Sequence, residues 1–227
     1  MTKCWNWLFH CDLRFVMSRC LLLKSLIIVD DFYDQPVAVR EMALRKSQWM
    51  PDKEVDGIKY GVETSNSFYT DEIVSCFGSL IGCDIDFHPA LMGFGVFSMY
   101  GEAARVDLTT HYDETEWSAI CYLTPDELCQ GGLSFYRHRE TGLLGPPTDE
   151  EARDLGYEDA GDFLKLRYFP DKLDPTAWEK VDEVSMRFNR MVLLRGSRKF
   201  HRAASGFGTA PENGRLTQRF FFNERVA

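Results

Sequence analysis

The sequence predicts a mainly β fold with flanking helices, in the α+β class. Helix-forming patterns concentrate before residue 83, and short segments with strand composition follow from residue 94 onward. A run of helices followed by a run of short strands is typical of α+β proteins with antiparallel sheets. Such closely spaced strands favour two packed sheets, so we expect a double-stranded β-helix, the jelly-roll arrangement, as the core.

The first part of the chain is expected to contain one strand and two helices. Residues 25–29 form a short apolar run bounded by acidic residues, which is the pattern of a buried strand. Asp34 is the expected cap of a helix over residues 36–47. A second helix is expected between Thr70 as its cap and Gly82 as its end. Its apolar residues form one stripe: Ile73, Val74, Phe77, Leu80 and Ile81. Both helices should cover the outside of the sheet.

Strand patterns then follow one another through the second half of the chain. We expect strands at residues 94–100, 105–112, 117–123, 132–136, 190–195 and 216–223. Residues 137–184 interrupt this series as an insertion, with helical patterns at 148–155 and from 174 to 181, and long excursions are often lids or binding loops. Residues 1–24 have no clear periodicity, so they are expected to be a loosely attached lead-in to a single domain of residues 25–227.

Composition excludes several classes of protein. The chain has 227 residues, a net charge of −9 and 44% hydrophobic residues, which suffices for one core. Because proteins that track phosphates need a basic face, no nucleic-acid partner is expected. The seven cysteines include no Cys-x-x-Cys pair, which favours free thiols in a reducing cytoplasm. No apolar run reaches membrane-spanning length, so we expect a cytoplasmic protein without a membrane partner.

The best candidate site begins at His111. On a strand, residues two apart point to the same face, so His111 and Asp113 would present an imidazole and a carboxylate together. His201, which follows an apolar run, is the candidate third ligand. Two histidines and one carboxylate form the ligand set of non-haem Fe(II) oxygenases, which leaves positions open for substrate and oxygen. The spacing alone is not selective, because His10 and His138 also precede an acid by two residues.

Further motifs follow His-x-Asp in a defined order. They are a Tyr-Leu-Thr strand at 122–124, a Gly-Gly-Leu-Ser-Phe strand at 131–135, the late His201, and Gly214-Arg215 opening an aromatic strand, with Tyr100 shortly before His111. This order resembles the 2-oxoglutarate- and Fe(II)-dependent dioxygenases, in their prolyl-hydroxylase-like branch. The resemblance covers roughly residues 92–224, apart from the insertion.

The resemblance implies a role for each of these residues. His111, Asp113 and His201 would bind iron. Arg215 would pair with the distal carboxylate of 2-oxoglutarate. Arg219, on the same strand face, is the alternative for this role, because His201 and Arg215 are farther apart in the sequence than is usual in the family. Tyr122 and Tyr100 would hydrogen-bond this cosubstrate.

The resemblance also implies an activity, which is hydroxylation of an unactivated C–H bond in a small molecule or an amino-acid side chain of a peptide. The reaction would consume O2 and 2-oxoglutarate and release succinate and CO2, with ascorbate as a candidate reductant. Because Asp113 fills the position that related halogenases vacate, hydroxylation or desaturation is favoured over halogenation.

Several alternatives stay open at this point. Trp117 and Arg137 are candidates for the substrate side, with core packing and a solvated loop as their respective alternatives. The same fold could instead carry a cupin-like metal isomerase or hydrolase that does not use 2-oxoglutarate, or a non-catalytic binding module. The sequence predicts neither the substrate nor the oligomeric state.

Overall fold

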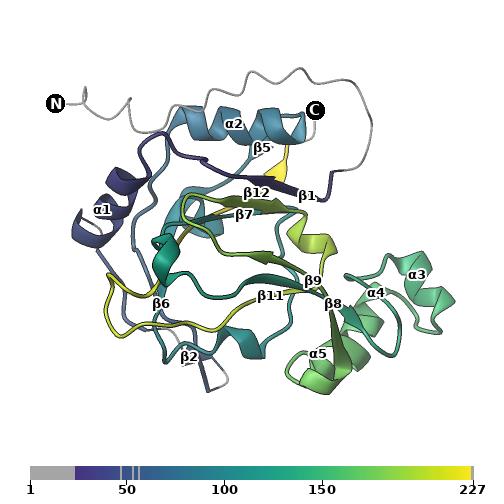
Figure 1. Ribbon diagram of the computed structural model, residues 1–227. Helices are drawn as coiled ribbons and strands as arrows, with labels where there is room; N and C mark the ends of the chain where they lie inside the picture. The colour runs from purple at the N-terminus through teal and green to yellow at the C-terminus, as the bar shows by residue number, and fades with distance from the viewer. Residues whose placement is uncertain (1–23, 47, 53, 56, 226–227) are drawn as a thin grey trace.

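The computed structural model describes residues 24–225 except 47, 53 and 56, so residues 1–23 of the predicted lead-in lie outside the described part. This part is mainly β, with antiparallel sheets and flanking helices, which confirms the coarse fold prediction (Figure 1). None of its helices combines the length and the apolar character needed to cross a bilayer.

The larger sheet forms the centre of the fold. Its strands follow the spatial order β1-β10-β7-β12-β6-β4, β5 pairs with the end of β12, and all pairings are antiparallel. The bounds of these strands are β1 Leu26–Val29, β4 Val62–Glu63, β5 Ile85–Asp86, β6 Val96–Tyr100, β7 Trp117–Tyr122, β10 Met191–Leu194 and β12 Arg215–Glu224. The predicted strands at 25–29, 94–100, 117–123, 190–195 and 216–223 are therefore confirmed.

Two helices cover one face of the larger sheet, as predicted (Figure 1). They are α1 (Pro36–Lys46) and α2 (Asp71–Ile81). Phe77 of α2 is fully buried and packs on Phe220 and Phe222 of β12, with ring centroids 5.1 and 5.2 Å away. The helix α2 begins after Thr70 and ends at Gly82, whose φ of 90° favours glycine, although the Thr70 hydroxyl makes no capping hydrogen bond.

A smaller sheet packs on the opposite face of the larger one. Its order is β11 (His201–Ala203), β8 (Gly132–His138), β9 (Trp178–Ser185). The apolar layer between the sheets is formed by Tyr122, Val192 and Leu194 from the larger sheet and by Leu133, Phe135 and Val184 from the smaller one, with Met186 and Phe207. A short hairpin, β2 (Glu54–Val55) with β3 (Ile58–Lys59), stands apart from both sheets.

The insertion contains three short helices that lie beside the smaller sheet (Figure 1). They are α3 (Asp149–Asp154), α4 (Ala160–Phe163) and α5 (Phe169–Asp171). A separate apolar cluster holds them, built from Ala152, Phe163, Tyr168, Trp178 and Phe200. The helical pattern at 148–155 is confirmed, and Thr148 and Glu151 form a reciprocal capping box at its start.

The helix predicted from 174 to 181 is wrong. Only Pro175–Ala177 form a short 3-10 turn, and β9 begins at Trp178. This strand pairs with β8 along its length and buries Trp178 and Val184, while its charged residues face solvent at a sheet edge. Pairing with β8 therefore overrides the helix-like composition of the segment.

The strand predicted at 105–112 is also wrong. Val106–Leu108 form a 3-10 turn, and His111 makes only an isolated bridge with His201. The backbone groups here bind other partners: the Thr110 N–H donates to the Lys172 carbonyl at 3.0 Å, and the Asp107 carbonyl accepts from Arg202 at 2.9 Å. Because these backbone groups find partners outside a sheet, the segment does not pair with a neighbouring strand.

Candidate metal centre

The structure brings His111, Asp113 and His201 together, with their ligand atoms within 4.8 Å of one another. Asp113 Oδ2 lies 3.3 Å from His201 Nε2, and Asp113 Oδ1 lies 4.0 Å from His111 Nε2. The two histidines are joined by reciprocal backbone hydrogen bonds of 3.0 and 2.8 Å. This single bridge, rather than strand alternation, sets the distance between the two imidazoles.

Backbone carbonyls orient both imidazole rings. The Nδ1 atom of His111 lies 3.2 Å from the carbonyl oxygen of Thr109, and that of His201 lies 2.8 Å from the carbonyl oxygen of Lys199. A proton on Nδ1 donated to these carbonyls leaves the Nε2 lone pair free and directed toward Asp113. This is the arrangement that metal-binding histidines adopt in proteins.

The Asp113 carboxylate is held by its own contacts. The Ser118 hydroxyl donates to Oδ2 at 2.5 Å, and the Asp113 N–H donates to the Gly196 carbonyl at 3.0 Å. A Cβ added at Gly196 would overlap Asp113 Oδ2 and would lie 2.5 Å from Ser118 Oγ. The position beside the carboxylate therefore admits only glycine without rearrangement.

The electrostatics of the triad suit a cation. Burial and the neighbouring His201 lower the pKa of His111 to about 4, so this imidazole is neutral at physiological pH. Burial alone would raise the pKa of Asp113, but the two histidines and Ser118 outweigh it and hold the pKa below its usual value. Burial likewise opposes protonation of His201, yet the Asp113 carboxylate raises the pKa of this imidazole. A carboxylate and two imidazoles in contact are a donor set for Fe(II) or another divalent transition metal.

A cavity of about 150 Å³ adjoins the triad. It is lined by the three candidate ligands and by Tyr60, Tyr100, Val106, Ser118, Ile120, Leu133, Ala203, Arg215, Thr217, Arg219 and Phe221. This volume is below the roughly 300–1,000 Å³ of drug-sized ligand sites, so the cavity fits a small molecule. An outer cavity of about 510 Å³ shares Tyr60, Val106 and His111 with it and gives access from the surface.

Arg215 lines this inner cavity and has 1% of its surface exposed. Its Nη2 donates to the Gly132 carbonyl at 3.0 Å, its Nη1 contacts the Met186 sulfur at 3.6 Å, and its Nε has no partner. Among the described residues, no carboxylate forms an ion pair with it. Burying a charge without an ion-pair partner is unfavourable, and the Glu183 carboxylate offsets this charge only from beyond ion-pair distance.

Tyr122 lies beside Arg215, with the guanidinium 5.3 Å from its ring centroid. Its hydroxyl is buried beside the Arg215 guanidinium without a hydrogen bond of good geometry, and burial raises the pKa of the phenol although Arg215 opposes this shift. Tyr122 is not among the residues that line the cavity. Its position nevertheless offers a hydrogen-bond donor next to the unpaired guanidinium.

Arg219, unlike Arg215, has an ion-pair partner. Its Nη2 forms an ion pair with Glu63 Oε1 at 2.6 Å, and its Nη1 donates weakly to the Tyr100 hydroxyl at 3.4 Å. Since Arg219 already has a carboxylate partner, Arg215 is the arginine that lacks one.

The two candidates for the substrate side lie elsewhere. Trp117 belongs to the core under α1 and α2, with 1% of its surface exposed, because strand alternation turns it away from Ser118 and the cavity. Arg137 lies on the outside of β8, where it pairs with Glu179 at 3.5 Å. Neither residue lines the cavities beside the triad.

Sequence reasoning missed Ser118, Gly196 and Glu63. Ser118 could have been found, because alternation along β7 puts it on the same face as Tyr122. Glu63 lies in a strand of two residues, and Gly196 lies in a 3-10 turn, so neither has a periodic signal.

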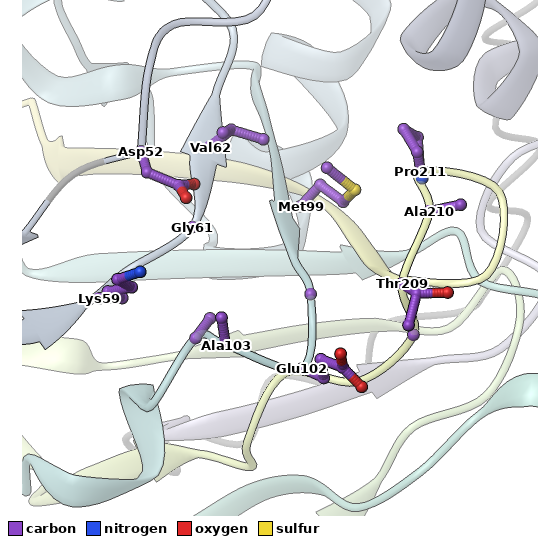
Figure 2. A pocket seen from close by; sticks show the side chains of 13 residues that line it. Asp52, Lys59, Gly61, Val62, Met99, Glu102, Ala103, Thr209, Ala210 and Pro211 are labelled. Atoms are coloured by element: carbon purple, nitrogen blue, oxygen red, sulfur yellow. The ribbon is translucent and has the colours of Figure 1, made fainter.

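A separate cavity of about 300 Å³ lies at the edge of the larger sheet (Figure 2). Asp52, Lys59 and Val62 border it on one side and residues 209–211 on the other, with Glu102 at its rim. None of the triad residues lines it, so it is distinct from the candidate metal centre.

Comparison with protein families matched residues 21–222 to a group described as a family of unknown function (DUF6445). The matched region contains the three candidate ligands, both arginines and the insertion. Comparison with curated proteins found no significant match.

Proposed function

The chain belongs to the DUF6445 family, whose function is unknown, and we propose that it is an Fe(II)- and 2-oxoglutarate-dependent oxygenase. It would hydroxylate an unactivated C–H bond of a small molecule or an amino-acid side chain. The observation that carries this proposal is the unpaired, buried Arg215 in the same small cavity as two histidines and one aspartate.

The charges around the cavity support a dicarboxylate cosubstrate. Arg215 and Arg219 contribute two positive charges, and Glu63 and Asp113 contribute two negative ones. A divalent metal at the triad would add two positive charges close to Arg215, which has no carboxylate within ion-pair distance among the described residues. The dianion 2-oxoglutarate offsets these charges, with its distal carboxylate on Arg215 and its keto-acid end toward the metal.

The strand order supports a double-stranded β-helix. Three consecutive pairs of strands, β7 with β8, β9 with β10 and β11 with β12, each cross from one sheet to the other. The candidate ligands lie between the two sheets, with His201 on β11 and Arg215 on β12. This arrangement supports the proposal of a jelly-roll core with the candidate site between its sheets.

The residues present fit this chemistry. Fe(II) with 2-oxoglutarate and O2 would supply the oxidant, converting substrate C–H to C–OH while 2-oxoglutarate becomes succinate and CO2. His111, Asp113 and His201 would hold the metal on one side. Arg215 and the Tyr122 hydroxyl would bind and orient the distal carboxylate, and the apolar side chains of Ile120, Leu133 and Phe221 would exclude water.

The test is an anaerobic titration of the apo-protein with Fe(II) and then 2-oxoglutarate, followed by the visible metal-to-ligand charge-transfer band. We expect the band in the wild-type protein and none in His111→Ala. Arg215→Gln should weaken 2-oxoglutarate binding about tenfold or more, as expected for loss of a charge-assisted pair. Arg45→Gln is the matched control, since this arginine is exposed on α1.

Two results would contradict the proposal. Iron binding without the band would favour the cupin-like enzyme that does not use 2-oxoglutarate. Failure of a folded protein to bind any divalent metal would favour a non-catalytic binding module.

A further inference from the structure

The insertion lies behind the candidate metal centre and does not cover its cavities. Its helices lie beside the smaller sheet (Figure 1). None of residues 137–184, all of which the structure describes, lines the inner or the outer cavity next to the triad. Residues 160–171 form one continuous helical run within the insertion. This run contacts the chain segments that carry the three candidate ligands.

Tyr168, in this helical run, touches the sequence neighbours of all three candidate ligands. Its hydroxyl donates to the carbonyl of Thr110, the residue before the first ligand, at 3.2 Å. Its ring centroid lies 5.2 Å from that of Tyr112, the residue between the first and second ligands. The same ring stacks on Phe200, the residue before the third ligand, with the centroids 5.6 Å apart and the planes at 9°. One buried side chain therefore joins the two separate segments that supply the ligands.

The rings that Tyr168 contacts lie on the side of the backbone opposite to the ligands. Neighbouring residues of an extended chain point to opposite sides, so Tyr112 and Phe200 face away from the cavity that the ligands line. Both rings belong instead to the apolar cluster that holds the insertion. Packing in this cluster therefore acts on the backbone that carries the ligands.

The insertion also holds both polar backbone groups of Thr110, a fully buried residue. Its N–H donates to the Lys172 carbonyl at 3.0 Å, and its carbonyl accepts from the Tyr168 hydroxyl. This carbonyl belongs to the peptide unit shared with His111, so the bond from Tyr168 fixes the direction in which the backbone enters the first ligand. Since a buried backbone group without a partner is costly, loss of either bond would favour movement of this segment.

The helical run is itself fixed to the smaller sheet through Asp171. Its Oδ2 atom lies 2.9 Å from Nε2 of His138, the last residue of β8, and its carbonyl accepts from the indole N–H of Trp178 on β9 at 2.9 Å. His138 is buried, and its Nδ1 lies 2.9 Å from Thr141 Oγ1. Both ring nitrogens of this histidine are therefore engaged, so it anchors the insertion and is not free to bind a metal.

We propose that the insertion supports the metal centre from behind and that Tyr168 is the positioning residue through which it acts. Tyr168 holds the two ligand-bearing segments in the arrangement that binds metal, although it touches neither the metal nor the cavity. This inference rests on the metal binding that the proposed function requires and is independent of 2-oxoglutarate. Because coupling is reciprocal, metal binding should in turn stabilise the helical run at 160–171.

The first test compares Tyr168→Phe with the wild-type protein in chelator-competition titrations with Zn(II), in Co(II) absorption spectra and in melting. The variant keeps the ring and removes only the hydroxyl. We expect Zn(II) affinity about two- to tenfold lower, which corresponds to the net contribution of one hydrogen bond, and a changed Co(II) ligand-field spectrum. A lower Tm with wild-type affinity and a wild-type Co(II) spectrum would show a merely structural role and overturn the proposal.

Tyr157→Phe is the matched control for this substitution. Tyr157 packs against the same apolar cluster, with its ring 5.3 Å from that of Phe163. Its hydroxyl makes no hydrogen bond to residues 107–113, all of which the structure describes. We therefore expect wild-type Zn(II) affinity and a wild-type Co(II) spectrum in Tyr157→Phe. Equal losses in the two variants would overturn the specific role of Tyr168.

The second test uses the wild-type protein, so it does not depend on the folding of a variant. Amide hydrogen exchange is measured with and without Zn(II). We expect metal binding to slow exchange at residues 164–172 about fivefold or more. The helix α3 is the internal control, because it belongs to the same insertion but makes no hydrogen bond to the fully described segment 107–113. No slowing at 164–172, or equal slowing in α3, would overturn the proposed coupling.

The proposed function and this inference fail in different ways. A folded wild-type protein that binds no divalent metal would overturn both. Metal binding without 2-oxoglutarate binding would overturn the proposed function and leave the role of the insertion intact. Normal metal and 2-oxoglutarate binding, with wild-type Zn(II) affinity in Tyr168→Phe and no slowing of exchange at residues 164–172, would overturn this inference alone.

Discussion

Substitution of Gly196 by alanine tests how Asp113 is held. The added methyl would overlap Asp113 Oδ2 and lie 2.5 Å from Ser118 Oγ, which is closer than real Cβ contacts allow. Gly196 does not have a left-handed backbone conformation, so alanine introduces a steric conflict rather than backbone strain. The carboxylate must therefore move away from the position in which it faces both histidines.

The size of the effect follows from the two consequences of this movement. Inserting a methyl into packed surroundings destabilises proteins by about 1–3 kcal/mol. For a domain of this size, this corresponds to a Tm lower by roughly 2–12 °C. Loss of the hydrogen bonds that orient a metal ligand lowers metal affinity about 10–100-fold, which corresponds to roughly 1.4–2.8 kcal/mol of binding free energy.

The assay is calorimetric titration of purified apo-protein with Zn(II), with melting followed in parallel. Gly161→Ala is the control, because it adds the same methyl to α4, where the nearest atom is the flexible Asp159 carboxylate at 3.2 Å. We expect normal affinity in Gly161→Ala and the 10–100-fold loss in Gly196→Ala. Equal affinity in both variants would refute the view that Asp113 is a ligand held in place by Gly196.

Three further predictions concern the metal-binding loop, pH and the core. Arg202→Gln removes hydrogen bonds to Thr110 Oγ1 and the Asp107 carbonyl, which hold the loop before His111. The substitution should lower Zn(II) affinity roughly tenfold. The control Arg153→Gln changes an exposed arginine and should leave the affinity unchanged. Unchanged affinity in Arg202→Gln would show that Arg202 does not hold the metal-binding loop in place. Asp113 raises the pKa of His201, while the pKa of His111 is about 4. At a pH just below the His201 pKa, metal binding should therefore release one proton, from His201, and at a higher pH it should release none. Zn(II) affinity would then fall about tenfold for each unit by which the pH is lowered below the His201 pKa. An affinity that does not change with pH would contradict this prediction. Phe77→Ala should destabilise the fold by about 3–5 kcal/mol in chemical denaturation, since Phe77 is fully buried; a loss below about 1 kcal/mol would contradict the packing described for α2.

Local pattern predicted most of the larger sheet. The strand β10 is apolar on both faces, β7 has one polar residue, Ser118, and β12 contains the aromatic run 220–222, because helices cover one face of the sheet and the smaller sheet covers the other. The apolar stripe of α2 likewise predicted the helix and its buried face. These elements have strong signals because each depends on burial, which sequence periodicity records.

The errors occurred where remote partners determine the conformation. β9 has four charged residues in eight, and only its pairing with β8 makes it a strand. The segment before His111 is bound by Arg202 and by the carbonyl of Lys172, both far away in the sequence. No local pattern encodes such contacts.

In the candidate site, too, local sequence signals identified some residues, while remote contacts determined the rest. His111, Asp113 and His201 could be selected from the order of motifs, and the structure brings them together. Whether Arg215 or Arg219 lacks a partner could not be predicted, because the answer depends on Glu63 in a two-residue strand. For Trp117 the sequence left both the substrate side and core packing open, and alternation along β7 turns its side chain into the core.

The most direct test of this account is an anaerobic crystal structure of the protein with Mn(II) and 2-oxoglutarate. We predict one metal ion bound by His111 Nε2, Asp113 and His201 Nε2, with the distal carboxylate of 2-oxoglutarate on Arg215 and the Arg219–Glu63 pair still formed. A metal bound elsewhere, or a distal carboxylate seated on Arg219 with Arg215 still unpaired, would contradict the account.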